Sequence, residues 1–396
     1  MDHFEVNNHM EFEEIHVDID RHPTGTVELS SDFGKVLVKP SVDDTWISKY
    51  DDFAVWLMLP VAMRVGKPLR IHGSGFSDTL VNAKKMSMIW SSWLPNHFRP
   101  VEVSFEDETL AKTKEQNAQK SLMFFSGGTD SSGALVRRLK EDKKQDLLTV
   151  HGMDYRLSDH DRFIKFINKT DALPKSVGAH RITVETDVYD LYKRHNVDLP
   201  GHHISHIFAL AGVAFSLKGY TEYLIAADQR LDHQFMRGPY GSNTATNGLF
   251  DDGSRAIVTL DDDITRSDKL AWIVQSEAAL DGLSVCDRTK HRPNNCGTCA
   301  KCTMMKVLFL ARIGYIPEIF IDQRLQKNWY KDFNFASIQK RVHLSDAIYT
   351  AKQYGNTNLI PEYHTAEHLF INNAKMYQKK RIRRWIKRHW RKLFSH

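Results

Sequence analysis

The sequence predicts an α/β protein in which residues 119–310 form a parallel sheet with helices on both faces. Two observations support this prediction. Short apolar runs alternate with helical runs from residue 120 onward, which is typical of a parallel sheet. Glycines and acidic residues follow these apolar runs, at the strand ends where such sheets bind ligands. A separate feature of the same segment is that the chain's four cysteines all lie between positions 286 and 302.

The first segment, residues 1–118, is expected to form an N-terminal α+β domain. It contains β-like runs at 34–38 and 69–72, a helical pattern over 78–93 and a further strand over 101–105. No motif in it points to a particular chemistry.

Neither the N-terminus nor the apolar runs indicate export or a membrane span. The first residues are acidic and lack the basic and apolar regions of a signal peptide. The longest apolar run, residues 53–63, contains Pro60 and is shorter than the roughly 20 residues that a bilayer requires. We therefore expect a cytoplasmic protein.

After a Lys-, Glu-, Thr- and Gln-rich stretch at 106–120, expected to be a linker, strands and helices alternate. The expected strands are 121–125, 146–154, 181–187 and 223–228. The expected helices are 134–142, 161–170 and 203–220, the last apolar nearly all round and hence buried. Beyond this domain, residues 311–374 read as a helical extension.

A Ser/Gly-rich loop follows the first of these strands. It reads Ser126-Gly127-Gly128-Thr129-Asp130-Ser131-Ser132 and leads into a helix. Adjacent glycines allow a tight turn that brings several backbone N–H groups toward one point. The helix N-terminus and the hydroxyls of Ser131 and Ser132 add further donors, so the loop is suited to bind pyrophosphate. It lacks the GxxxxGK[ST] pattern of Walker-type loops.

The cysteines indicate a metal site. Their order is Cys286, Cys296, Cys299 and Cys302, with two overlapping C-x-x-C steps. Four thiolates at this spacing reach one tetrahedral ion, and Zn²⁺ in a closed, structural site is the natural occupant. An iron–sulfur cluster is the competing interpretation.

The loop resembles a known signature. SGGTDSS is similar to the SGGxDS motif of the PP-loop ATP pyrophosphatases, which have a Rossmann-like fold of the HUP (adenine nucleotide alpha hydrolase-like) type. The resemblance implies that ATP and Mg²⁺ bind here, and that a substrate oxygen attacks the α-phosphorus and releases pyrophosphate. It also implies that Asp130 supports either the loop or the magnesium.

Loop and cysteines together most resemble the 7-cyano-7-deazaguanine synthases of queuosine biosynthesis. These pair the loop with four zinc-binding cysteines in the order C…CGxCxxC, as in Cys286 and residues 296–302 here. Such enzymes adenylate a carboxylate, convert it to an amide with ammonia and then activate the amide with a second ATP to give a nitrile. The segment around Lys269 resembles a helix start whose lysine neutralises phosphate.

The chain also departs from that family. In the family's P-G-R-N element the R-N pair is replaced here by His202 and His203, and the segment after residue 228 lacks the Y-x-D-C-R pattern. The resemblance covers residues 119–310 only. We therefore expect a paralogue that acts on another acceptor.

The expected site can be stated by residue. Catalytic roles are assigned to Asp130, Ser131 and Lys269. Nucleotide contacts are assigned to Ser126, Gly127, Gly128, Thr129, Asp130, Ser131, Ser132, Gly152, Asp154, His202, Asp228 and Arg266. Asp228, Arg266 and Lys269 can equally be surface charges, and His202 can line a polar pocket.

The tail, residues 375–396, carries ten Lys and Arg and no acid, so the rest of the chain sums to −5 within a net charge of +5. Its apolar residues recur at helical spacing, which is typical of a helix lying on an anionic membrane surface. Binding to RNA and docking on the protein itself are the alternatives. Membrane binding would place the protein at the inner face of the membrane.

The sequence thus predicts an ATP-dependent, AMP-forming carbon–nitrogen ligase acting on a small-molecule or macromolecular carboxylate. All four cysteines belong to the cluster, so ammonia or an amine would come free or from a partner glutaminase. A tRNA-modifying enzyme and a nucleotide-binding regulator are the alternative functions. A homodimer is a further expectation.

Overall fold

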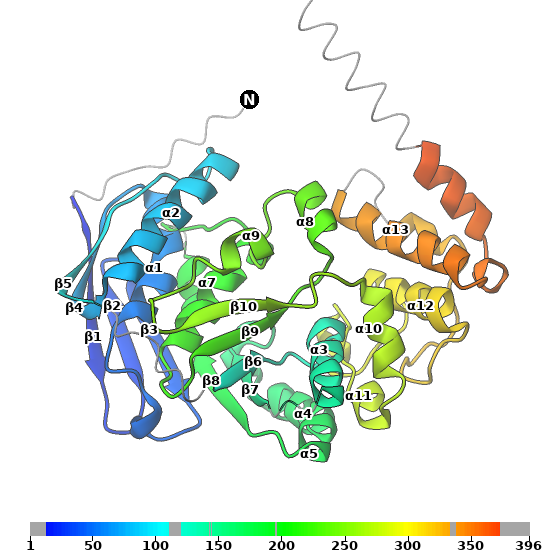
Figure 1. The fold of residues 1–396 in the computed structure, drawn as a ribbon, viewed down its shortest axis with the longest axis horizontal. Helices are drawn as coiled ribbons and strands as arrows, with labels where there is room; N and C mark the ends of the chain where they lie inside the picture. The colour runs from blue at the N-terminus through cyan, green and yellow to red at the C-terminus, as the bar shows by residue number, and fades with distance from the viewer. Residues whose placement is uncertain are drawn as a thin grey trace, which may run out of the picture.

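The computed structural model describes residues 13–110, 120–332 and 338–372, except residues 142, 144 and 195. It shows an α/β protein built on one ten-stranded sheet that is mixed but largely parallel (Figure 1). The strand order is β10-β9-β6-β7-β8-β3-β2-β1-β4-β5.

The strands are β1 (Ile15–Arg21), β2 (Val27–Ser31), β3 (Gly34–Pro40), β4 (Leu69–Phe76), β5 (Val103–Thr109), β6 (Ser121–Phe124), β7 (Asp146–His151), β8 (Arg181–Thr186), β9 (Glu222–Ala226) and β10 (Ala256–Leu260). The α-helices are α1 (Asp52–Val65), α2 (Ser77–Trp93), α3 (Thr129–Lys140), α4 (His160–Thr170), α5 (Ala172–Ser176), α6 (Val188–Tyr192), α7 (His202–Phe215), α8 (Leu231–Arg237), α9 (Thr244–Asn247), α10 (Arg266–Ile273), α11 (Glu277–Asp281), α12 (Ala300–Ile313) and α13 (Ile338–Gln353). Short 3₁₀ turns lie at Asp44–Trp46, Leu157–Asp159, Thr289–His291, Trp329–Asp332 and Thr357–Leu359.

Strands β6 to β10 form a continuous parallel block at one end of the sheet. They are arranged in the order β8-β7-β6-β9-β10, and every neighbouring pair is parallel. Along the chain, β6, β7 and β8 follow one another in one direction across the sheet. Strand β9 then pairs with the opposite side of β6. Such a reversal creates a crevice at the carboxyl ends of the two central strands, where ligands bind in open α/β sheets.

The N-terminal segment extends this same sheet. Strand β3 pairs antiparallel with β8, with Val38 opposite Thr186, and β2, β1, β4 and β5 continue outward from β3. β5 runs to Thr109, so residues 106–109 of the expected linker are strand, and residues 111–119 lie outside the described part of the chain. The boundary predicted at residue 118 therefore does not separate two sheets.

Alternate side chains of the central strands pack in two different cores, one on each face of the sheet. From β6, Leu122 and Phe124 pack in a core with α1 and α7, whereas Met123 packs in a core with α3, α10 and α12. This is the alternation expected of a strand that is buried on both faces. Helices therefore cover both faces, as the sequence predicts.

Helices α1 and α7 join the N-terminal segment to the rest. Every residue from Asp52 to Met63 in α1 is buried. In α7, Gly212 allows close contact, since a Cβ there would meet Leu57 Cγ of α1 at 2.3 Å. The buried apolar run of α1 thus packs against the buried helix predicted around residues 203–220.

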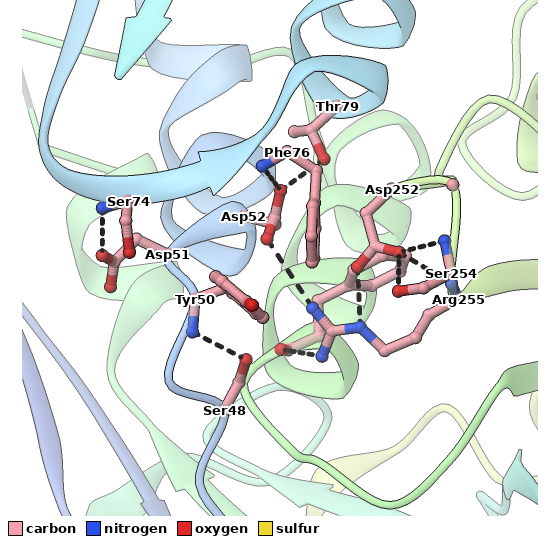
Figure 2. Close-up of polar contacts among 12 residues, drawn as sticks. Ser48, Tyr50, Asp51, Asp52, Ser74, Phe76, Thr79, Asp252, Ser254 and Arg255 are labelled. Atoms are coloured by element: carbon pink, nitrogen blue, oxygen red, sulfur yellow. Dashed lines mark hydrogen bonds and ion pairs between the residues drawn. The ribbon is translucent and has the colours of Figure 1, made fainter. Parts of the chain in front are cut away.

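A buried polar network reinforces this contact (Figure 2). Asp52, at the start of α1, accepts hydrogen bonds from the Thr79 hydroxyl at 2.6 Å and the Phe76 N–H at 3.0 Å. Arg255, in the turn before β10, donates to Asp252 at 2.7 Å and lies 3.7 Å from Asp52. Burial and the nearby charge of Asp252 raise the pKa of Asp52 to about 6.

In the part of the chain that the structure describes, no helix combines the length and the apolar character needed to cross a bilayer. The segment expected to be a helical extension contains the end of α12, α13 and helical residues 363–372. The basic tail at 375–396, with the membrane and RNA interactions predicted for it, lies outside the described residues.

Candidate functional site

The predicted phosphate loop lies at the carboxyl end of β6, where the strand order reverses between β6 and β9. Helix α3 begins at Thr129, directly after the two glycines. The first N–H groups of a helix have no partner within it, and the helix dipole places positive charge at the same end. The loop therefore presents backbone donors at the ligand-binding edge of the sheet, an arrangement suited to a phosphate group.

The loop is held in shape by its own residues. The Ser131 hydroxyl accepts a hydrogen bond from the Ser126 N–H at 3.2 Å and donates to the Gly128 carbonyl at 3.3 Å. Gly127 has φ of +63°, and a Cβ there would meet Thr170 Cγ2 at 2.5 Å. Glycine is therefore required at position 127 both by the backbone conformation and by the space available.

Asp130 is held by two cations from α10. Its carboxylate accepts hydrogen bonds from Arg266 Nε at 3.1 Å and Nη2 at 2.6 Å, and Lys269 Nζ lies 3.6 Å away. Burial alone raises the pKa of Asp130, but the charges of Arg266 and Lys269 outweigh it and hold the pKa below its ordinary value. Lys269 is fully buried and also donates to the Ala227 carbonyl. Of the two roles expected for Asp130, support of the loop agrees with this geometry.

The start of α10 is fixed by capping contacts. The Thr265 hydroxyl and the Asp268 carboxylate form a capping box around the first turn. Ser267 donates its N–H and hydroxyl to Asp346 of α13, at 3.1 and 2.5 Å. Arg266 lies between these anchored residues, so α13 of the helical extension also helps to position it.

The four cysteines form a buried cluster, and it could hold a metal. All four Sγ atoms lie within 4.8 Å of one another. The Cys286–Cys299 and Cys296–Cys302 Sγ pairs are 3.9 and 4.0 Å apart. A tetrahedral ion with bonds of 2.3 Å to sulfur requires separations of about 3.8 Å. The thiolates therefore fit a closed zinc site of the type that the sequence predicts.

The surroundings of the cluster favour the thiolate form of Cys296 and Cys299. The N–H and hydroxyl of Thr298 donate to Cys296 Sγ at 3.4 and 3.7 Å and lower the pKa of Cys296 despite its burial. Cys299 caps α12 and accepts a hydrogen bond from the Cys302 N–H at 3.5 Å. Buried Lys306, one turn further along α12, donates to the carbonyl of Gly297 within the cysteine loop. Its positive charge offsets part of the negative charge of four thiolates.

The segment that carries the cysteines, which we call the cysteine segment, contacts the loop of residues 126–132 directly. The Ser284 N–H, two residues before Cys286, donates to the Gly127 carbonyl at 2.9 Å. The Thr129 hydroxyl lies 3.6 Å from Met305 Sδ, in the helix that Cys299 caps. A metal that fixes the cysteines would therefore also fix one side of the loop.

A cavity of about 180 Å³ opens between the loop and the cysteine segment. The loop lines one side with Ser126, Gly128, Thr129 and Asp130, and Arg266 adjoins them. The other walls are Asp154, Tyr155, Phe166, Ser284, Val285, Cys286, Arg292, Lys301, Met304 and Met305. The cavity is thus lined by the loop on one side and by cations and apolar side chains on the other.

The remaining predicted residues occupy different places. Ser132 is buried in the first turn of α3, and Gly152 packs so closely on the end of β8 that no side chain fits there. Asp154 is exposed and lines the cavity. His202 is exposed at the start of α7, where its ring stacks on that of His206. Asp228 lines a separate, smaller hollow beside Arg266. The structure therefore brings the loop, Asp154 and Arg266 together around one cavity.

Sequence reasoning missed several residues around this cavity. Arg292 donates to the Cys286 carbonyl at 2.7 Å and the Asp154 carbonyl at 3.0 Å, and it lies 5.9 Å from the ring of Tyr155. Lys301 forms an ion pair with Asp287 at 2.9 Å. Both cations lie between the clustered cysteines in the sequence, and this position is the sequence feature that could have identified them.

No protein-family model and no curated protein matches this chain.

Proposed function

We propose that the protein is an ATP-dependent, AMP-forming ligase that activates a carboxylate for amide formation. The observation that supports it most is the loop of residues 126–131 at the strand-order reversal. Its backbone donors border the cavity, and Asp130 is fixed by Arg266 and Lys269. Such a loop suits the pyrophosphate portion of ATP.

The first step would form an acyl adenylate. A carboxylate oxygen of the substrate attacks the α-phosphorus of ATP, the bond from that phosphorus to the bridging oxygen breaks, and pyrophosphate leaves. Mg²⁺, when bound, offsets charge on the leaving pyrophosphate. Among the cavity carboxylates, Asp130 is occupied by two cations, whereas the Asp154 side chain is 61% exposed and 3.9 Å from Arg292. Asp154 is therefore the better-placed Mg²⁺ ligand.

The second step would consume the adenylate. The nitrogen of ammonia or an amine attacks the acyl carbon, AMP leaves with the carboxylate oxygen, and the nitrogen loses a proton. Arg292 and Lys301, which line the cavity, are suited to hold an anionic acceptor. All four cysteines belong to the cluster, so the nitrogen source would be free ammonia, an amine or a partner glutaminase.

The test is ATP–pyrophosphate exchange in the presence of Mg²⁺, with pools of carboxylate metabolites and no amine. Exchange that depends on one pool would demonstrate reversible adenylation and lead to the acceptor. Exchange that appears only with added RNA would favour the tRNA-modifying alternative. If the zinc-loaded protein binds ATP but exchanges with neither, the ligase proposal fails and a nucleotide-binding regulator is favoured.

Two matched serine variants connect the result to the loop. Ser131→Ala removes a hydroxyl that closes the loop, so exchange should fall on the order of tenfold, the equivalent of one lost hydrogen bond. Ser176→Ala removes a hydroxyl that likewise donates to a backbone carbonyl, in α5, and should leave exchange unchanged. Equal effects of the two substitutions would contradict the assignment of the loop.

A further inference from the structure

Three residues outside the ATP cavity bring ligand atoms together. His151 ends β7, Glu185 lies opposite it on β8, and His160 begins α4. One nitrogen of each histidine and one carboxylate oxygen lie within 4.8 Å of one another. Two imidazoles and a carboxylate form a ligand set that leaves coordination positions open for water.

The hydrogen bonding of His151 fixes which of its nitrogens faces the carboxylate. Its Nε2 lies 3.0 Å from the Arg156 carbonyl, which can only accept, so Nε2 carries the proton and donates. In the neutral ring Nδ1 then has a free lone pair. Nδ1 is buried, has no hydrogen-bond partner and lies 3.8 Å from Glu185 Oε1. Two acceptors therefore face each other with no proton between them.

A second proton on His151 would resolve this conflict, but it would place a positive charge on a side chain that is only 1% exposed. A cation between the ring and the carboxylate resolves the conflict without charging the ring. Metal-bound histidines typically donate their other N–H to a backbone carbonyl, as His151 does to Arg156.

We propose that His151, His160 and Glu185 bind a first-row divalent cation of the zinc type. Imidazole ligands favour such ions, whereas Mg²⁺ and Ca²⁺ prefer oxygen. Ligand atoms around tetrahedral zinc are about 3.4 Å apart, close to the 3.8 Å between His151 and Glu185. His160 is exposed at the start of its helix, so its side chain has room to complete the set.

The nearest competing cation leaves the required oxygen accessible. Lys39 of β3 approaches Glu185 through the other carboxylate oxygen, Oε2, at 3.4 Å. It is 55% exposed and can move into solvent. Oε1, the oxygen that faces His151, remains available for a metal.

A metal here would hold one wall of the ATP cavity in place. The His151 ring stacks on Phe163 at 4.0 Å, and Phe163 packs with Tyr155 and Phe166, which line that cavity. The ion would tie the connection between β7 and α4 to β8. It lies behind the aromatic wall and does not depend on the proposed ATP chemistry.

The test is the zinc content of the full-length protein after incubation with excess Zn²⁺ and gel filtration, measured by mass spectrometry. Wild type should hold one zinc more per chain than His160→Ala or Glu185→Gln. His97→Ala, which removes another exposed histidine, should match wild type. In a zinc titration, each ligand substitution should weaken the second binding event by more than about tenfold.

Other outcomes would overturn the proposal. If wild type and His160→Ala retain the same zinc content, these residues do not bind the ion. Co²⁺ at this site should add no sulfur-to-metal charge-transfer absorption to that of the cysteine cluster, so an added sulfur band would place the second ion elsewhere. Displacement of zinc by Mg²⁺ would show that the site belongs to a different class of cation.

Discussion

The two adjacent glycines of the loop at residues 126–132 are under different constraints. Gly127 has φ of +63°, and a Cβ would collide with Thr170. Gly128 has φ of −83°, which any residue adopts, and a Cβ there would approach only the Ser126 hydroxyl, at 3.3 Å. Position 127 therefore needs glycine for the fold, whereas position 128 needs it only if a ligand approaches the backbone.

These differences predict separate effects. Gly127→Ala should lower the free energy of unfolding by at least about 1–2 kcal/mol, because it adds a left-handed backbone penalty to a steric clash. Gly128→Ala should cost less than about 1 kcal/mol but weaken ATP binding. Urea unfolding and calorimetric ATP titration measure the two quantities. Equal destabilisation by the two substitutions would contradict this distinction.

The ion pair between Asp130 and Arg266 predicts a pH effect. Asp130→Asn leaves two buried cations without their carboxylate and should cost on the order of 3 kcal/mol at pH 7. Because the pKa of Asp130 is lowered in the folded protein, its stabilisation is complete above the unfolded pKa, near 4, and is lost as pH falls through the lower folded value.

The free energies of unfolding of wild type and Asp130→Asn should therefore converge only below about pH 4. Asp263→Asn, which removes an exposed carboxylate 3.5 Å from Arg137, should cost less than about 1 kcal/mol. Urea unfolding across this pH range measures all three proteins. A constant gap between wild type and Asp130→Asn down to pH 3 would show that the carboxylate charge is not the source of the stabilisation.

Local spacing predicted some of these residues and not others. The residues of the loop lie close to one another in sequence, and so do the four cysteines, so a local pattern was enough to predict each group. Asp130 and Arg266 are 136 positions apart, and only the packing of α10 on α3 brings them together. For that reason, the sequence alone was equally consistent with a nucleotide contact by Arg266 and with a solvent-exposed Arg266 side chain.

At the scale of elements, most strands were predictable: the runs at 34–38, 69–72 and 101–105 correspond to β3, β4 and β5, and the four runs from residue 121 onward correspond to β6 to β9. Strands β1, β2 and β10 were not predicted. β6 to β9 are short apolar runs bounded by glycine and acidic residues. β10 was not recognised, since it alternates only weakly between buried and partly exposed residues at the edge of the sheet. β1 and β2 were also missed. Both have polar or charged side chains at alternate positions, because only the other residues reach the core.

Removal of a metal from the cysteine cluster should also affect the loop of residues 126–132, which contains no cysteine. Cys302→Ser, at a fully buried position, should abolish tight zinc binding, lower stability by several kcal/mol and weaken ATP binding. The physical reason is that Ser284, near Cys286, holds the Gly127 carbonyl of the phosphate loop. Zinc content, thermal unfolding and calorimetric ATP titration measure these effects. Lys301→Ala, between two ligands but exposed, should leave the zinc in place.

The start of α1 predicts a pH effect of the opposite sign. The pKa of Asp52 is raised to about 6, so the folded protein binds an additional proton between about pH 4 and pH 6. Its stability should therefore fall as pH rises through this window. Asp52→Asn should remove that slope and leave stability at pH 7 equal to or above wild type. Urea unfolding from pH 4 to pH 7 measures the slope, and Asp44→Asn removes an exposed carboxylate as the control.

At the scale of the whole molecule, the site depends on both halves of the sheet. The cavity lies at the ends of β6 and β7 and beside α3, α10 and α12. Strand β8 is the neighbour of β7 in the sheet, and β3 of the N-terminal segment pairs with the other side of β8. α7 is buried against α1, and Gly212 can be replaced by no larger residue without displacing Leu57. We therefore expect the loop to hold its geometry only if the N-terminal strands are in place.

Separate expression of residues 1–118 and 119–396 tests this dependence. The second segment alone would expose an unpaired edge on β8 and the apolar face of α7, which includes Ile207, Phe208 and Phe215. Such surfaces lead to aggregation, so we expect each segment to be insoluble when produced alone and the two to copurify when produced together. The reassembled complex should recover ATP binding, measured by calorimetry. A soluble 119–396 segment that binds ATP as tightly as the intact chain would show instead that the N-terminal strands are an accessory, and that the site forms without the other half of the sheet.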